Sequence, residues 1–151
     1  MAAVTCSRAL PSTPEKWALM ESETEPKRPG IGKTVLVVDD SAAIRKMVVT
    51  AFLSHGFKTC VEAENGQEAI DIASQTKPDV IVLDLSMPVM NGLQSAPELR
   101  ELLPQTPIIL FTLYGQSLSQ IEASKSGISL VLEKTMPLSM LIEKAHQLMA
   151  A

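Results

Sequence analysis

The sequence predicts a doubly wound α/β fold, in which helices cover both faces of a five-stranded parallel sheet. Short apolar runs rich in Val, Ile and Leu occupy residues 35–38, 80–83, 108–111 and 130–132. Such runs are typical of strands buried on both faces of a parallel sheet. Helical patterns separate them at the spacing of βα units. Because crossovers between parallel strands are right-handed, this alternation predicts helices on both faces.

Five helices and one weaker strand complete the predicted alternation. The first helix has apolar residues at helical spacing and is expected to end at Gly56 in a left-handed conformation. The weaker strand is predicted at residues 57–61. The expected helices cover residues 42–55, the segment from Asn65 to the stop at Pro78, a segment that follows Gly92, and residues 117–125 and 138–150.

Composition indicates a soluble globular domain. The chain has 151 residues, a length typical of one domain, with 46% hydrophobic and 20% charged residues. A net charge of −4 provides no basic stripe, so we expect neither direct nucleic-acid binding nor membrane binding. Cys6 and Cys60 are too few for a disulfide framework. Because the sequence contains neither a membrane-spanning stretch nor a secretory signal, a cytoplasmic location is expected.

The N-terminal segment differs from the rest of the chain. Four prolines and an acidic stretch at residues 21–25 predict a flexible tail over residues 1–32, followed by one domain over residues 33–151. Residues 17–20, Trp-Ala-Leu-Met, form the only apolar patch of this tail. The patch is either a docking segment or part of a solvated tail, and translation could also start at Met20.

Polar residues follow the predicted strands at the points where these end. Asp39 and Asp40 follow the first strand, Asp84 the third, Thr112 the fourth and Lys134 the fifth. Ligands of parallel sheets bind beyond the carboxyl ends of the strands, so these side chains should meet at one edge. Clustered carboxylates repel one another unless a cation is bound, and an oxygen-rich pocket suits Mg²⁺. The sequence therefore predicts a magnesium site with a nucleophilic carboxylate at Asp84.

Each of these residues also has a structural interpretation. Asp39 and Asp40 could cap the helix that follows them, because Asp is common at that position. Lys134 could be a solvated side chain at a strand end. Thr112 could either bond a phosphoryl oxygen or simply end its strand as a β-branched residue. The ordered set of all five favours the functional interpretation.

Five motifs in this order resemble the receiver domain of two-component response regulators. The resemblance implies a flavodoxin-like fold with strand order 2-1-3-4-5 and extends over residues 33–151. The matching segments are residues 35–41, 62–69, 78–92 and 106–112, together with Lys134.

The resemblance also implies roles for individual residues. Asp84 would accept phosphate from a histidine kinase or phosphotransfer protein, Thr112 would be the switch hydroxyl and Lys134 would pair with the phosphoryl group. No effector domain follows the last predicted helix, so a stand-alone regulator that contacts a downstream protein is expected. The implied magnesium ligands are Asp40, Asp84 and the carbonyl of Ser86, with Asp39 assisting through water.

Several positions depart from the family pattern, among them Pro97, which falls inside the predicted third helix and would kink it unless it lies in the first turn. Leu113 follows the switch threonine, where the family usually has Ala or Gly. Val131 replaces an aromatic residue of the fifth strand, and Thr135 follows Lys134 where proline is usual. These changes leave the phosphorylation chemistry in place and predict an altered output switch.

Other classes of function remain open at this point. An aspartyl-nucleophile phosphatase of the haloacid-dehalogenase type would use similar groups, but it needs Asp-x-Asp on its first strand, which Asp39-Asp40-Ser41 does not provide. A flavin-binding module would need a Ser/Thr/Gly-rich loop in place of the two carboxylates. A receiver-like interaction module that does not respond to phosphorylation is a third possibility.

Overall fold

The fold is a five-stranded parallel sheet between two layers of helices. The computed structural model of the chain describes residues 32–113 and 120–150. All strand pairs are parallel and the order is β2-β1-β3-β4-β5, which confirms the predicted flavodoxin-like topology. The strands are β1 Thr34–Val38, β2 Thr59–Ala63, β3 Val80–Leu83, β4 Ile108–Thr112 and β5 Leu130–Glu133.

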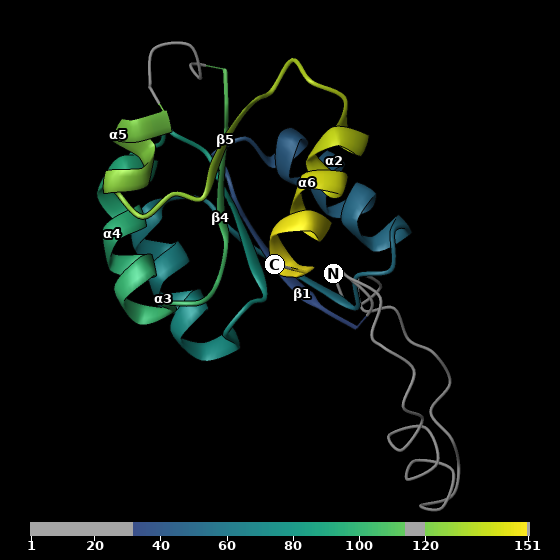
Figure 1. The fold of residues 1–151 in the computed structure, drawn as a ribbon, viewed down its shortest axis with the longest axis horizontal. Coiled ribbons are helices and arrows are strands. Elements are labelled where there is room, and N and C mark those ends of the chain that lie inside the picture. Colours follow the sequence, from purple (N-terminus) through teal and green to yellow (C-terminus); the bar gives the residue numbers. More distant parts are fainter. Residues whose placement is uncertain (1–31, 114–119, 151) are drawn as a thin grey trace, which may run out of the picture.

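Helices alternate with the strands and cover both faces of the sheet. Figure 1 shows α2 and α6 on one face and α3, α4 and α5 on the other. This arrangement follows from the right-handed crossovers that connect parallel strands. The helices are α2 Ala42–Ser54, α3 Gly66–Thr76, α4 Gly92–Leu102, α5 Gln120–Lys125 and α6 Leu138–Ala150.

Each face of the sheet has its own hydrophobic core. On the α2–α6 side, Phe52, Phe57 and Leu141 are fully buried or nearly so. On the other side, Ala73 and Leu99 are fully buried, and small alanines let the helices approach the sheet closely. Burial of one large apolar side chain contributes about 1.5–3 kcal/mol, so the two cores hold the central strand ends in place.

Three helices begin with side-chain caps just beyond the carboxyl ends of strands. The side chains of Ser41, Asn65 and Asn91 accept backbone N–H bonds in the first turns of α2, α3 and α4. Gln94 completes a capping box with Asn91. Loss of such a cap typically costs about 1 kcal/mol. These caps place the loops between strand and helix at one edge of the sheet.

Most predicted boundaries are confirmed, with two corrections. The strand predicted at residues 57–61 is β2 Thr59–Ala63, because the chain is still turning at Phe57. The Phe57 N–H donates to the Phe52 carbonyl, and the Phe57 ring enters the core. Gly56 has the expected positive φ, 93°. Thr112 is the last residue of β4 rather than the residue after it.

Two predicted segments fall partly or wholly outside the described ranges. The helix predicted at residues 117–125 is described only as α5, because residues 117–119 lie outside these ranges. Residues 1–31 also lie outside them, so the flexible tail stays a prediction. None of the helices in the described ranges is long and apolar enough to span a membrane.

Candidate functional site

Strand register brings the first and third strand ends together. Val38 of β1 pairs with Leu83 of β3, so the residues that follow them are neighbours. The Asp84 N–H donates to the Val38 carbonyl at 2.9 Å, which fixes the backbone at this point. The aspartates that follow these two strands therefore reach the same edge of the sheet, as the sequence predicts.

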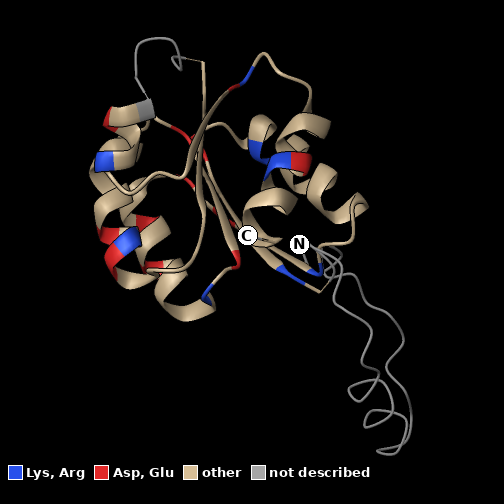
Figure 2. Cartoon of the chain, viewed as in Figure 1, with Lys and Arg blue, Asp and Glu red and all other residues tan. Residues whose placement is uncertain are grey.

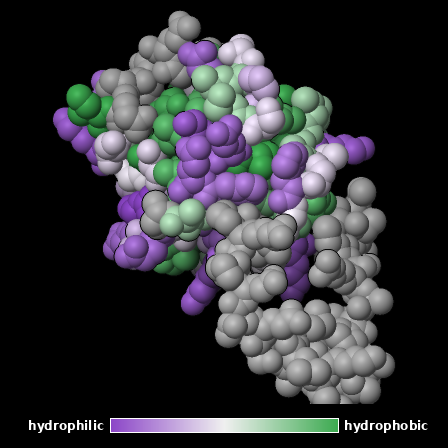
Figure 3. Space-filling view, turned by 45° about the vertical axis from the view of Figure 1, so that its right-hand side comes forward, coloured by the Kyte–Doolittle hydropathy of each residue, from purple (hydrophilic) through white to green (hydrophobic). Residues whose placement is uncertain are grey.

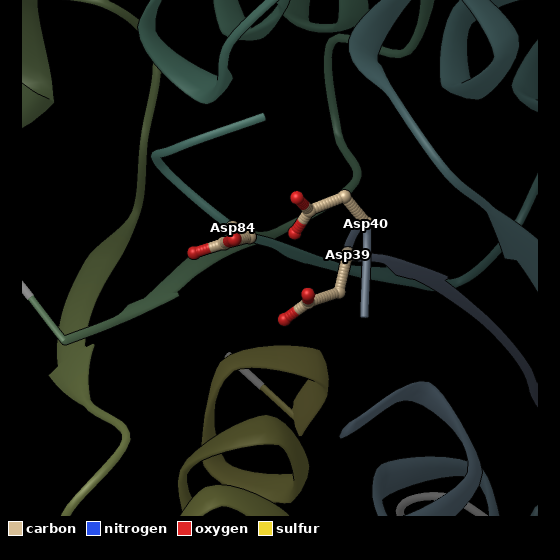
Figure 4. A group of neighbouring side chains, drawn as sticks. All are labelled: Asp39, Asp40 and Asp84. Atoms are coloured by element: carbon tan, nitrogen blue, oxygen red, sulfur yellow. The ribbon is translucent and has the colours of Figure 1, made fainter. Parts of the chain in front are cut away.

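Asp39, Asp40 and Asp84 form a compact carboxylate cluster. One oxygen from each side chain lies within 4.8 Å of the others, and Figure 4 shows the three side chains at the adjoining ends of two strands. Asp39 and Asp84 are buried, with 3% and 5% exposure, whereas Asp40 is exposed. The cluster thus has two buried carboxylates and one that is open to solvent.

Lys134 lies between the two buried carboxylates. Its Nζ is 2.6 Å from Oδ2 of Asp39 and 3.3 Å from Oδ1 of Asp84. Lys134 directly follows the last residue of β5, and the backbone N–H of Lys134 donates to the Thr112 carbonyl at 2.9 Å. The lysine is therefore part of the site and is not a solvated strand-end side chain.

The electrostatics of the site disfavour a second buried negative charge. Burial, together with the charge of Asp39, raises the pKa of Asp84 from 3.8 to about 6, although Lys134 acts in the opposite direction. For Lys134, burial alone would lower the pKa, but its hydrogen bond to Asp39 and the charge of Asp84 outweigh burial and raise the pKa. A bound cation would relieve the repulsion between the carboxylates.

These side chains line one open cavity of about 490 Å³. The Asp39–Asp40–Asp84 cluster and Lys134 form its polar part, and Ser86 lies on the loop that follows Asp84. Because carboxylate and carbonyl oxygens are the ligands that Mg²⁺ prefers, the donor set fits this metal.

Leu113 lines the same cavity and is 64% exposed. Its side chain is therefore not packed beneath a helix. A leucine at the mouth of the cavity leaves less room beside Asp84 than an alanine or a glycine would.

Thr112 reaches the same edge of the sheet but does not line the cavity. Its residue is fully buried at the end of β4, next to Glu133 of β5. Val131, at the position where the family usually has an aromatic residue, is only partly buried and packs with the core on the α3–α5 side. Val131 therefore belongs to the core rather than to the cavity.

The loop after Asp84 is held close to that residue by Gly92. A Cβ atom on Gly92 would collide with the Asp84 carbonyl oxygen, and the Gly92 N–H donates to the Leu85 carbonyl at 3.0 Å. Between them, exposed Val89 has a φ of 68°, which is rare for a β-branched residue. Only glycine allows the first turn of α4 to approach the end of β3 this closely.

Arg45 is a site-supporting residue that the sequence analysis missed. Its Nη1 donates to the Asp39 carbonyl at 2.6 Å, and its guanidinium also pairs with Glu62 and Glu64 near the end of β2. The strand order could have indicated this contact. Because β2 is the neighbour of β1, the acidic residues at the end of β2 lie beside the first turn of α2, which carries Arg45. Arg45 therefore connects Asp39 to the neighbouring strand end.

Comparison with known proteins agrees with this geometry. The family model described as response regulator receiver domain matches residues 35–146. The chain belongs to this family. Receiver domains are signalling domains of two-component systems that bind Mg²⁺ at an acidic pocket and interact with histidine kinases and downstream targets.

Among curated relatives, the receiver is similar to chemotaxis protein CheY of Thermotoga maritima, with 34% identity over 117 residues. That alignment covers 78% of this chain and 98% of the relative. It is also 39% identical over 99 residues to the phosphate regulon transcriptional regulatory protein PhoB of Pseudomonas aeruginosa, where the match covers 64% of this chain and only 43% of PhoB. The similarity therefore lies in the receiver part, which both types of regulator contain.

Solved structures show the same fold. The receiver domain of the Francisella response regulator 1452 matches with a TM-score of 0.71 and 31% identity, covering 78% of this chain and 97% of that one. Chemotaxis protein CheY4 of Vibrio cholerae matches with a TM-score of 0.69 and 30% identity, covering 77% and 98%.

Proposed function

We propose that this receiver accepts a phosphoryl group on Asp84 from a histidine kinase or phosphotransfer protein, with Mg²⁺ as cofactor. The observation that carries the proposal is the position of Asp84, a buried carboxylate at an open cavity with Lys134 Nζ 3.3 Å away. The carboxylates Asp39 and Asp40 adjoin it. Together, these side chains can accept a phosphoryl group and balance its negative charge.

The transfer itself needs little more than positioning. An oxygen of Asp84 forms a bond to phosphorus while the bond from phosphorus to the donor's histidine nitrogen breaks. The electron pair of that bond returns to the imidazole, which takes up a proton. Asp84 must be ionised to attack, and Lys134, already between Asp39 and Asp84, favours the ionised form.

The remaining side chains have supporting roles in the proposal. Asp40, Asp84 and the carbonyl of Ser86 would hold Mg²⁺, with Asp39 assisting through water, and the metal would neutralise charge on the phosphoryl oxygens. Lys134 would pair with the phosphoryl group. Thr112, which is buried at the end of β4, is proposed as the switch hydroxyl.

We further propose a single-domain regulator that acts in the cytoplasm through contact with a downstream protein and without direct binding to nucleic acid. Acidic and basic residues are interspersed over the described helices, as Figure 2 shows, so these helices carry no continuous basic surface. The proposed role is that of a phosphoacceptor that modifies itself, rather than of an enzyme that turns over an external substrate.

Phosphorylation with a small donor tests the acceptor directly. With Mg²⁺ and acetyl phosphate, intact-mass measurement should show one added phosphoryl group on the wild type and none on Asp84→Asn. Asp71→Asn, which changes an exposed aspartate on α3, is the matched control and should be modified like the wild type. Phosphorylation of the Asp84→Asn variant would refute the assignment of Asp84 as the acceptor. An unmodified wild type would favour the phosphorylation-insensitive module instead.

Metal binding is tested by thermal unfolding. Mg²⁺ should raise the melting temperature of the wild type, because a ligand that binds only the folded state stabilises it. Asp40→Ala should abolish that rise. An unchanged rise in the variant would place the cation elsewhere.

Rapid turnover of p-nitrophenyl phosphate would instead favour the phosphatase alternative.

A further inference from the structure

An exposed apolar groove runs along α2 beside the proposed phosphorylation site. Two adjoining hollows of about 260 and 560 Å³ share Met47 and Leu138. Met47 and Met136 are 53% and 41% exposed, and Figure 3 shows hydrophobic residues among hydrophilic ones on this side. Contiguous exposed apolar surface usually marks an interaction site. The α2 groove is defined by Ile44, Met47, Ala51, Phe111, Met136 and Leu138.

The N-terminal segment joins the domain at the C-terminal end of α2, whereas the groove lies along the helix toward its N-terminal end. The Gly32 N–H donates to the Gly56 carbonyl at 3.3 Å, and Gly56 lies just beyond the end of α2. From Gly56 to Met47 is about 14 Å at 1.5 Å per helical residue. Residues 21–31 separate the apolar patch at residues 17–20 from Gly32. Eleven residues reach at most about 37 Å when fully extended, so this segment is long enough to bridge the distance.

Charge and side-chain chemistry also match. Residues 21–25 carry three glutamates directly after the patch. α2 contains Arg45 and Lys46 and no acidic residue, and Lys46 lines the groove beside Met47. Tryptophan is an effective anchor for an apolar hollow because it buries a large area at little entropic cost.

We propose that residues 17–20 of this chain dock in the α2 groove, with Trp17 in the hollow lined by Ile44 and Phe111. A tether of this length provides an effective concentration in the millimolar range, so an anchor with a dissociation constant of about 1 mM is docked about half of the time. Residues 21–31 connect this anchor to Gly32, and Lys46 in the groove would attract the glutamates of residues 21–25.

Docking at this place would regulate the neighbouring site. Lys134 lines both the α2 groove and the cavity that contains Asp84. An indole in the groove therefore stands next to the route by which a protein donor must approach Asp84. A donor as small as acetyl phosphate needs only the cavity itself. The docked segment thus hinders protein donors selectively, a consequence that rests on the proposed function.

Fluorescence of the full chain tests the docking without assuming any function. Trp17 is the only tryptophan, so its emission reports on this segment alone. Relative to the urea-unfolded protein, emission should shift to shorter wavelength, and acrylamide quenching should fall about twofold at the expected half occupancy. Neither property should depend on protein concentration. Unfolded-like emission in the folded protein would overturn the proposal, and protection that increases with concentration would point to a second copy and overturn it too.

Two matched variants locate the contact. Met47→Glu places a charge in the groove and should restore unfolded-like quenching, whereas Ile121→Glu changes an even more exposed apolar residue on α5 and should not. Circular dichroism checks that both variants fold, and Met136→Glu replaces Met47→Glu if that variant does not. If Trp17 stayed protected from acrylamide quenching in the variant with a charge in the groove, this docking site would be refuted.

Phosphorylation rates test the regulatory consequence. In Trp17→Ser, a kinase that transfers phosphate to the wild type should do so about twofold faster, in proportion to the open fraction, whereas acetyl phosphate should react at an unchanged rate. Equal kinase rates in the two proteins would overturn the regulatory role. No phosphorylation of either protein, with the fluorescence result intact, would count against the proposed function and leave the docking supported.

Discussion

Neutralisation of Asp84 should make the metal-free receiver more stable. Burial and the charge of Asp39 raise the pKa of Asp84 from 3.8 to about 6, so the folded state binds a proton more tightly than the unfolded state does. At 1.36 kcal/mol per pKa unit, this difference corresponds to about 3 kcal/mol. The ionised carboxylate therefore destabilises the folded protein at neutral pH by up to about this amount.

The pH dependence follows from the sign of this difference. Between about pH 4 and pH 6 the folded state holds more protons, so stability falls as pH rises through this window and levels off above it. Asp84→Asn removes the titrating group. Lys134 is not left unpaired in the variant, because Asp39 remains 2.6 Å away. The variant should therefore match the wild type near pH 4 and exceed it by up to about 3 kcal/mol at pH 7.

Urea unfolding in EDTA at several pH values measures this directly. Asp40→Asn removes an exposed carboxylate of the same cluster and is the matched control, which should keep the wild-type slope between about pH 4 and pH 6. Saturating Mg²⁺ should reduce the difference in unfolding free energy between Asp84→Asn and the wild type, because the cation balances the negative charge of the Asp84 carboxylate. Parallel stability curves for Asp84→Asn and the wild type over the whole pH range would refute the electrostatic argument.

Three further predictions concern other residues. Leu113→Ala should speed phosphorylation by small donors and autodephosphorylation by one to two orders of magnitude, which needs only about 1.4–2.7 kcal/mol in the barrier; rates unchanged from the wild type would show that the exposed leucine does not obstruct the cavity. Gly92→Ala should destabilise by about 1–3 kcal/mol, because its Cβ would collide with the Asp84 carbonyl; urea unfolding checks this, and wild-type stability would contradict it. Burial and the charge of His55 lower the pKa of His146, which stacks on an aromatic ring, so the unfolded state binds the proton more tightly and stability from this residue is lost as pH falls below about 6.5. His146→Gln should lose less stability than the wild type below that pH in thermal unfolding, and an equal loss would contradict the assignment.

The strand ends were predictable because each depends on a local signal. The apolar runs and the polar residues that follow them are visible in the sequence, and the parallel topology then brings Asp39 and Asp84 to one edge. The strand at 57–61 was placed two residues early because aromatic Phe57 fits a strand pattern equally well. Tertiary packing decided the outcome, since this ring is fully buried beside Phe52 in the core.

Long-range contacts of the site were not predictable in the same way. Arg45 lies on α2 and meets Glu62 and Glu64 only because β2 is the neighbour of β1. The approach of Gly92 to Asp84 likewise depends on how α4 enters the sheet edge. A sequence pattern marks such residues as charged or small, but the partner appears only when strand order and helix entry are combined.

The contrast between Thr112 and Leu113 has a simple geometric origin. Side chains of a strand alternate between its two faces. In β4, Leu110 belongs to the core on the α3–α5 side, and Phe111 belongs to the core on the α2–α6 side. Thr112, the last residue of β4, follows Leu110 in this alternation and is buried, whereas Leu113 lies one residue beyond the strand and lines the cavity with Lys134. The bulky departure from the family pattern, rather than the threonine beside it, therefore lies at the mouth of the site.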